Sequence, residues 1–237
     1  MKSLLVLLPA LGLAIAGCLP FGLGGELGGE ELAFVDVTYV EQREVDSTAT
    51  RFHDIDVWLM PLEDSCERFG LMLDSLAELR AELDFGMPPD EYCDGWEAIW
   101  EEHTGLESFW VGHFKLHALP RGENETPKTA YSWFDETGAG NPSGPSWDGD
   151  LAWYPAPTFD ACAVEFAGDD LYAPVLHPAT AGTVELTAYT EDESITAKLE
   201  PVFEAAGEDG IRGRAPADLC TDALDWPLAF GTGEDGT

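Results

Sequence analysis

The sequence predicts a single α+β domain: an antiparallel β-sandwich or open barrel with a two-helix insertion and a C-terminal β-meander. Three observations support this fold class. Apolar and polar residues alternate with a period of two near both ends of the domain, which is typical of strands with one buried face. Two helical patterns lie close together between these segments. Apolar residues make up 45% of the chain and include eight tryptophans, which is enough to build a core.

The first two predicted strands occupy residues 33–40 and 51–60. In both segments, successive side chains alternate between apolar and polar types. His53 is expected at the end of the second strand or at the edge of the core, not as a metal ligand. The two faces of the second strand are His53, Ile55, Val57 and Leu59 on one side, and Asp54, Asp56 and Trp58 on the other.

Two helices are predicted next. Asp64 followed by Glu67 resembles a capping box, and the helix behind it runs to about residue 83. Gly-Met-Pro-Pro at 86–89 ends this helix, and a second helix covers 90–103. Apolar residues recur at three- and four-residue steps in both helices, which indicates faces that pack on the core. These residues are Cys66, Phe69, Met72, Leu73, Leu76, Leu79 and Leu83, then Tyr92, Trp96, Ile99 and Trp100.

The middle of the chain alternates strands with polar loops. A strand is predicted at 107–119 and a short aromatic strand at 129–134. Residues 137–149 are rich in Gly, Pro and Ser and are expected to form an exposed loop. Extended structure resumes at 151–154 and 159–166.

The clearest strand signal lies near the C terminus. Residues 183–189, 195–200 and 211–215 alternate between apolar and polar side chains and are joined by acidic or Gly-rich turns. Three successive strands of this kind predict an antiparallel meander.

The N-terminal segment resembles the signal peptide of a bacterial lipoprotein. Lys2 precedes an apolar run at 4–16, which is shorter than the roughly 20 residues of a transmembrane helix. The motif Ile-Ala-Gly-Cys at 15–18 resembles the bacterial lipobox. This resemblance implies a thioether-linked diacylglycerol on Cys18, cleavage before it, and acylation of the new amino terminus by a fatty acid such as palmitate. Two or three acyl chains anchor a protein stably to a membrane.

The domain organisation follows from this motif. Residues 1–17 are expected to be the signal peptide, 18–31 a flexible Gly-rich tether, 32–227 one globular domain and 228–237 a disordered tail. Residue 19 is Leu and not Asp, which in the usual sorting pattern of lipoproteins implies the outer membrane of a bacterium with two membranes. Whether the domain faces the periplasm or the outside stays open.

The chain is strongly acidic, with 46 Asp and Glu against 11 Lys and Arg and a formal net charge of −35. Such a surface repels nucleic acid and anionic membrane faces. Adaptation to a salty or divalent-rich setting is favoured over specific calcium binding, because no Asp-x-Asp-x-Asp-Gly loop with a Glu at its end occurs. The Asp-Gly-Asp cluster at 148–150 is interpreted as a turn. No cofactor is expected.

Cysteine counting predicts two disulfides. Lipidation of Cys18 leaves four cysteines, and an even number in an exported chain is typical of disulfide pairs. Three pairings can be drawn. Cys66–Cys93 and Cys162–Cys220 are favoured because each pair brackets one compact block of sequence, and free buried thiols are the alternative.

A further pattern covers the C-terminal third of the chain: Gly-Thr-Val-x-Leu at 182–186, a hairpin, then Gly213 and Cys220. It resembles a pattern in uncharacterised β-rich envelope lipoproteins of unknown function. Ala197 stands where such chains often carry Gly. The resemblance implies a closing meander and no assigned activity.

His113 and His117 are the candidates for metal binding. On a strand they share a face but lie about 13 Å apart, too far to bind one ion. An exposed His-Lys-His face is therefore favoured. No Gly-x-Ser-x-Gly motif marks a catalytic serine, and nothing selects two carboxylates for glycoside hydrolysis.

Trp133, Trp147 and Trp153 are the candidates for ligand binding. Exposed aromatic rings could stack on sugars or bind a protein. The favoured interpretation is that Trp133 and Trp153 are core residues and Trp147 alone is exposed.

Together these observations predict a membrane-anchored envelope lipoprotein whose lipid contact is the acylated Cys18. A non-enzymatic structural or binding module, with an envelope protein or glycan as partner, is the favoured role. The alternatives are a small envelope hydrolase that relies on acidic residues and on His113 or His117, and a carbohydrate-binding module.

Overall fold

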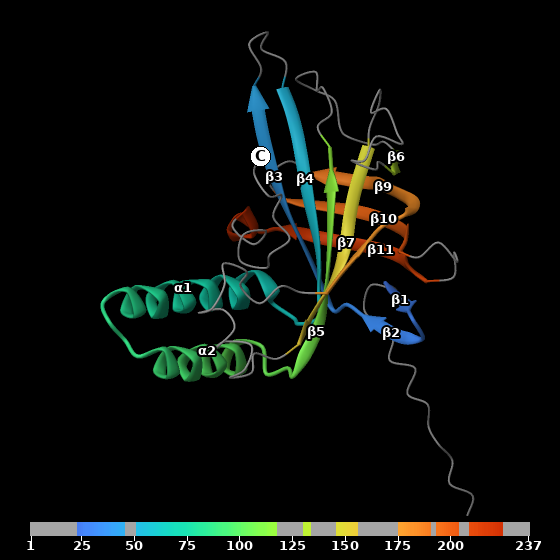
Figure 1. Ribbon diagram of the computed structural model, residues 1–237. Coiled ribbons are helices and arrows are strands. Elements are labelled where there is room, and N and C mark those ends of the chain that lie inside the picture. The colour runs from blue at the N-terminus through green and yellow to red at the C-terminus, as the bar shows by residue number, and fades with distance from the viewer. Residues whose placement is uncertain are drawn as a thin grey trace, which may run out of the picture.

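The computed structural model describes residues 23–45, 51–117, 130–133, 146–155, 175–190, 193–203 and 209–224. This part of the chain forms eleven strands, two α-helices and one short 3-10 helix. The strands make one strongly curled sheet, and the two α-helices project from it as a hairpin (Figure 1). The predicted α+β fold class, with a helical insertion in a β-rich domain, is confirmed.

Most predicted elements are present, and β8 and the β1–β2 pair are additions to them. The strands are β1 (Gly24–Leu27), β2 (Glu30–Ala33), β3 (Asp36–Val45), β4 (Arg51–Met60), β5 (Ser108–Leu116), β6 (Ala130–Trp133), β7 (Ser146–Pro155), β8 (Val175–Pro178), β9 (Ala181–Thr190), β10 (Ser194–Val202) and β11 (Gly210–Leu219). The helices are α1 (Ser65–Asp84), α2 (Pro89–His103) and the 3-10 helix η1 (Thr221–Leu224).

The strand pairings close into a ring of eight strands. Its order is β10-β9-β6-β7-β5-β4-β3-β11, and β11 pairs again with β10. The pair β1–β2 extends the sheet from β11, and β8 extends it from β7. The contacts β6–β7 and β11–β3 are parallel and short, whereas the rest of the ring is antiparallel. Figure 1 shows β3, β4, β5 and β7 crossing β9, β10 and β11 at a steep angle, so the sheet is barrel-like. The predicted C-terminal meander is β9–β10–β11.

The Gly-rich segment before the domain contains a β-hairpin. β1 and β2 pair antiparallel, and Gly28 and Gly29, with φ angles of 60° and 85°, form the turn between them. Gly25 lies so close to the carbonyl oxygen of Gly210 in β11 that a Cβ at this position would collide with it. The glycines therefore serve a tight turn and a close strand contact, and the tether prediction is wrong for residues 24–31. Residues 18–22 and the predicted tail at 228–237 lie outside the described residues.

The ring of strands encloses the main apolar core. Val57 of β4, Phe114 of β5 and Leu199 of β10 are fully buried there. Trp147, at the start of β7, is also fully buried, and its ring centroid lies 5.9 Å from that of Phe114. Alternate residues of each strand supply this core because side chains on a strand point to opposite faces in turn.

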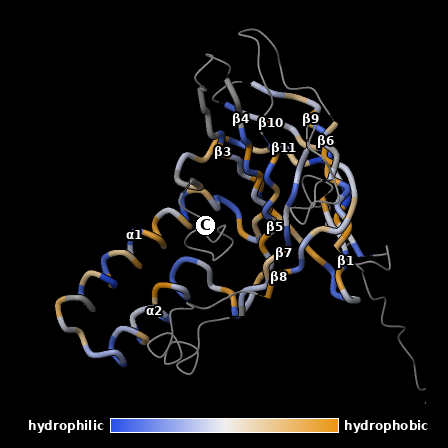
Figure 2. Tube along the Cα trace, turned by 45° about the horizontal axis from the view of Figure 1, so that its top comes forward, coloured by the Kyte–Doolittle hydropathy of each residue, from blue (hydrophilic) through white to orange (hydrophobic). Residues whose placement is uncertain are grey.

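The helices cover part of the outer face of the sheet. Phe69 and Met72 of α1 and Trp100 of α2 pack with Phe109 of β5 and Tyr154 of β7 in a second buried cluster. Trp100 and Phe109 stack with ring centroids 4.9 Å apart. Apolar and polar stretches alternate along both helices (Figure 2). The predicted apolar faces pack on the sheet through Phe69, Met72 and Trp100. Tyr92 and Trp96, by contrast, form a separate cluster against Leu76 and Leu79, between the two helices. Neither α-helix in the described part of the chain combines the length and apolar character needed to cross a membrane.

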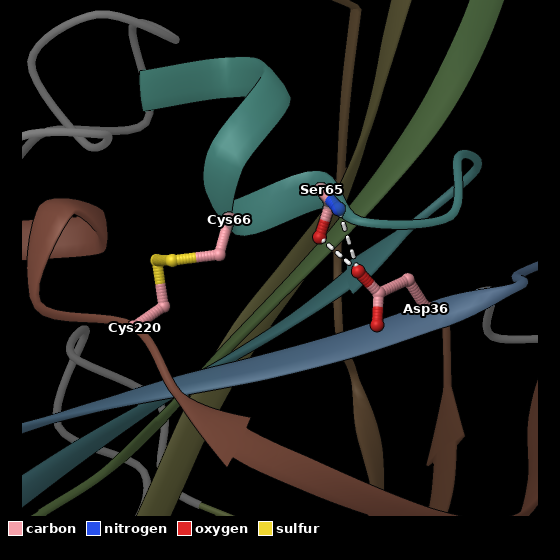
Figure 3. Close-up of a disulfide and its surroundings, with 4 residues drawn as sticks. All are labelled: Asp36, Ser65, Cys66 and Cys220. Carbon is pink, nitrogen blue, oxygen red and sulfur yellow. Dashed lines mark hydrogen bonds between the residues drawn. A yellow bond between two sulfur atoms is a disulfide. The ribbon is translucent and has the colours of Figure 1, made fainter. Parts of the chain in front are cut away.

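A disulfide joins Cys66, in the first turn of α1, to Cys220, directly after β11 (Figure 3). The two Cα atoms lie 5.7 Å apart. The favoured pairings Cys66–Cys93 and Cys162–Cys220 are therefore wrong. Cys93 is also disulfide-bonded, and Cys162 lies outside the described residues.

Sheet topology explains this pairing. β11 runs parallel to β3, with Leu219 opposite Tyr39, and the N–H of Cys220 donates to the carbonyl of Tyr39 at 2.8 Å. β4 pairs with β3 along its whole length and leads into α1. Cys66 therefore lies beside Cys220 although 154 residues separate them along the chain.

The start of α1 is held by a second long-range contact. Asp36, at the start of β3, accepts hydrogen bonds from the N–H and the Oγ of Ser65 at 2.7 and 2.6 Å (Figure 3). Helix N-termini leave N–H groups without partners inside the helix, and a carboxylate is a good acceptor for them. The capping box predicted at Asp64 and Glu67 involves neighbouring residues only, so it did not predict this contact with Asp36 of β3.

Candidate functional site

Acidic and basic side chains alternate across the outer face of the three neighbouring strands β4, β5 and β7. β5 and the residue after it supply bases, whereas β4 on one side and β7 on the other supply carboxylates. Lys115 lies opposite Asp56 on β4 and opposite Asp148 on β7, and His113 lies opposite Asp150. We call this set the ionisable ladder. It consists of Asp54 and Asp56, of His113, Lys115 and His117, and of Asp148 and Asp150.

The buried centre of the ionisable ladder is the pair of His113 and Asp56. His113 Nε2 lies 2.8 Å from Asp56 Oδ1, and the two residues are only 8% and 3% exposed. Trp58 stacks on the imidazole with ring centroids 4.1 Å apart. Asp56 Oδ2 is buried without a hydrogen-bond partner among the described residues. The predicted exposed His-Lys-His face is therefore wrong at His113, because β5 is buried on both faces around this residue.

A second imidazole–carboxylate pair lies at the end of β5. His117 Nε2 is hydrogen-bonded to Asp148 Oδ2, and both residues are half-buried. The hydrogen bond to Asp148 raises the pKa of His117, with burial opposing it. Asp148 and Asp54 raise this pKa further by their negative charges, whereas the nearby ammonium of Lys115 lowers it.

Asp150 is a buried carboxyl group of the ladder with a raised pKa. Burial raises its pKa to about 6, and the charge of Asp148 adds to this rise. The opposing influence is His113, whose positive form lowers the pKa of Asp150. Asp150 Oδ1 is buried and has no hydrogen-bond partner within the described part of the chain. Asp150 therefore changes its protonation state in mildly acidic solution.

The charge of the ionisable ladder depends on its bound protons. Four carboxylates and one ammonium leave three negative charges while both imidazoles are neutral. Protonation of His117 and of Asp150 reduces this to one negative charge. The arrangement can therefore take up and release protons, which is the basic requirement of an acid–base site.

The structure does not bring His113 and His117 to one metal ion. Each imidazole binds a different carboxylate. Over the described ranges, no group of three or more His, Cys, Asp or Glu side chains is placed to hold a metal.

The tryptophan candidates lie differently from either expectation. Trp147 is fully buried in the ring core and cannot stack on a sugar. The cause is that β7 begins at Ser146, so the exposed loop predicted at 137–149 ends earlier than expected. Trp133 and Trp153 are half-buried, and Trp133 Nε1 donates to the carbonyl of Ala179 at 3.0 Å.

Sequence reasoning missed the carboxylates of the ladder, although a signal was present. Asp-x-Asp occurs on β4, His-x-Lys-x-His on β5 and Asp-Gly-Asp on β7. Each has the period of two that places its charged side chains on one face. Gly149 within the last motif allows β7 to approach β5, because a Cβ there would collide with the carbonyl of His113. The interpretation of residues 148–150 as a turn is therefore wrong.

Comparison with known proteins returned no match to a protein family, to a curated protein or to a solved structure.

Proposed function

We propose that this chain is an exported lipoprotein, held at the bacterial envelope by acyl chains on Cys18, whose domain is a non-enzymatic structural or binding module. Its proposed partners are the membrane lipid and a protein or glycan of the envelope. Leu19 favours the outer membrane as its location. The lipobox motif at 15–18 supports the anchor.

The disulfide between Cys66 and Cys220 is the observation that carries the export part of this proposal. Disulfides persist in oxidising compartments such as the periplasm and the cell surface, and are rare in the cytosol. This disulfide and the contact between Asp36 and Ser65 fix the start of α1 to the sheet. A rigid scaffold that carries a helical hairpin suits a module that binds through its outer surface.

The experiment is lipid labelling in a bacterial host. The full chain and its Cys18→Ser variant are expressed with labelled palmitate, and membranes are separated from soluble fractions. We expect label and membrane association for the wild type only. Cys93→Ser is the matched control, because it removes a cysteine but not the lipobox. Equal labelling of the wild type and Cys18→Ser would reject the anchor.

A small envelope hydrolase is the second candidate, and the pair of His113 and Asp56 favours it. A buried carboxylate that orients an imidazole is an arrangement used for general acid–base catalysis. The test is turnover of ester, amide and glycoside substrates by the wild type, by His113→Gln and by the control His177→Gln on β8. Turnover lost in His113→Gln alone would support a hydrolase, whereas equal turnover in both variants, or none in the wild type, would reject it.

A further inference from the structure

We propose that the ionisable ladder is a proton-operated latch, which binds protons in mildly acidic surroundings and then holds β5 more firmly to β7. This inference goes beyond the proposed function and does not depend on the lipid anchor. It rests on the alternation of bases and carboxylates across three paired strands.

The contacts of the ladder connect the strands in a diagonal pattern. Asp56 on β4 lies opposite Lys115 but binds His113, two residues away on β5, at 2.8 Å. Asp148 on β7 also lies opposite Lys115 but binds His117, two residues away in the other direction. His113 is therefore hydrogen-bonded to β4, and His117 is hydrogen-bonded to β7. Protonation of His117 adds the attraction of an ion pair to its hydrogen bond with the Asp148 carboxylate.

Asp150 contributes by losing its charge. As a carboxylate it places a buried negative charge on β7, and its Oδ1 lacks a hydrogen-bond partner among the described residues. As a carboxylic acid it is neutral and gains a donor. Burial raises its pKa to about 6, so this change occurs in mildly acidic solution. The raised pKa of His117 places its own protonation at higher pH than in an unfolded chain.

The charged groups that face these residues come from all three strands. Asp150 is faced by His113 from β5 and by Asp148 on its own strand, while Pro178 of β8, opposite Asp150, brings no charge. His117 is faced by Asp148 from β7, by Asp54 from β4 and by Lys115 on β5.

Burial and these neighbouring charges determine whether proton binding stabilises or destabilises the folded chain. Because the folded-state pKa values of Asp150 and His117 lie above their unfolded values, the folded chain binds more protons. The stability that the ladder contributes is therefore present at low pH and is lost as pH rises through these folded-state values.

The test is urea unfolding of the full chain, with its disulfides intact, between about pH 8 and about pH 5. The variant is Asp150→Asn, which is neutral at every pH. Its matched control is Asp74→Asn on the exposed side of α1, which removes the same charge from the acidic chain at a distance from the ladder. We expect the folding equilibrium constant of the wild type and of Asp74→Asn to rise as pH falls. In Asp150→Asn that rise should be smaller by roughly tenfold or more.

Two further measurements complete the test: a salt control, and an NMR titration that replaces the variant if it does not fold. A high salt concentration screens repulsion across the surface but not a buried contact, so the difference between the two variants should persist in salt. If Asp150→Asn does not fold, NMR titration of His117 in the wild type replaces it, and a pKa above that of free histidine is expected. Equal pH dependence of the two folded variants, or, in the replacement test, a His117 pKa at or below the free value, would overturn the proposal.

Discussion

His113 illustrates how neighbours decide what a residue can do. Its imidazole is stacked on Trp58, hydrogen-bonded to Asp56 and almost excluded from water. The same residue on an exposed strand would be an ordinary surface base. Burial has the opposite consequence for Trp147, because an indole packed against Phe114 stabilises the core and is lost as a binding surface.

The pair of His113 and Asp56 should behave as one unit. Either Asp56→Ala or His113→Ala leaves the other buried polar group without its partner, which costs about 1–3 kcal/mol of unfolding free energy. The double variant removes both partners and should cost clearly less than the sum of the single variants. Urea unfolding of all four proteins measures this coupling. Strictly additive losses would show that the contact contributes no coupling energy.

Asp150 should destabilise the folded chain above its raised pKa. Its pKa is about 6 in the folded chain, above the ordinary aspartate value of 3.8, so charged Asp150 costs its full folding free energy above about pH 6. We expect Asp150→Asn to raise the unfolding free energy at about pH 8 by about 1–3 kcal/mol, and to have little effect near pH 4. A variant that is less stable than wild type at pH 8 would contradict this sign.

Among the elements, α1 depends on contacts from distant parts of the chain. Its apolar face is visible in the sequence, and the prediction of its length was close to the observed Ser65–Asp84. Its attachment was not predictable, because Asp36 and Cys220 come from strands whose pairing is set by the whole sheet. Local periodicity determines which residues of α1 face inward, but not which strand they meet.

Removal of the Asp36 carboxylate should loosen the first turn of α1. Asp36→Ala deletes the acceptor for the N–H and the Oγ of Ser65, at a cost of about 1–2 kcal/mol. Amide hydrogen exchange should become faster at the start of α1 and stay unchanged in β9 and β10. Asp218→Ala on β11 is the control. Unchanged exchange in α1 would show that the contact does not hold the helix.

Loss of the Cys66–Cys220 disulfide should be the most costly single change to the fold. Because the cysteines lie 154 residues apart, the disulfide restricts most of the unfolded chain, and chain-entropy arguments give about 4–5 kcal/mol. The double variant Cys66→Ala/Cys220→Ala should unfold at much lower urea concentration than wild type. A loss below about 1 kcal/mol would mean that native contacts alone hold α1 on the sheet.

For the whole molecule, strand pairings between neighbours in sequence could be predicted, whereas the pairings that close the ring could not. The C-terminal meander joins neighbours in sequence, so its alternation was enough to predict it. The contacts β11–β3 and β6–β9 join distant segments, and no local pattern encodes them. The error at Cys66 arises where such distant strands meet, whereas the turn at Gly28 and Gly29 and the alternating charges of the ladder are local patterns.

The remaining cysteines provide a further prediction for the whole chain. Cys93 is disulfide-bonded, and Cys66 and Cys220 are already paired with each other. If Cys18 carries lipid, Cys162 is the partner left for Cys93. Peptide mapping without reduction should recover a linked Cys93–Cys162 peptide. A free Cys162 thiol would exclude this pairing.

Mass spectrometry of the full chain, purified from bacterial membranes without reduction, tests the proposed anchor and export most directly. We expect an amino-terminal peptide that begins at an acylated Cys18, together with a linked peptide that contains Cys66 and Cys220. An unmodified Cys18 still attached to residues 1–17, with Cys66 and Cys220 as free thiols, would contradict both the anchor and the oxidising compartment.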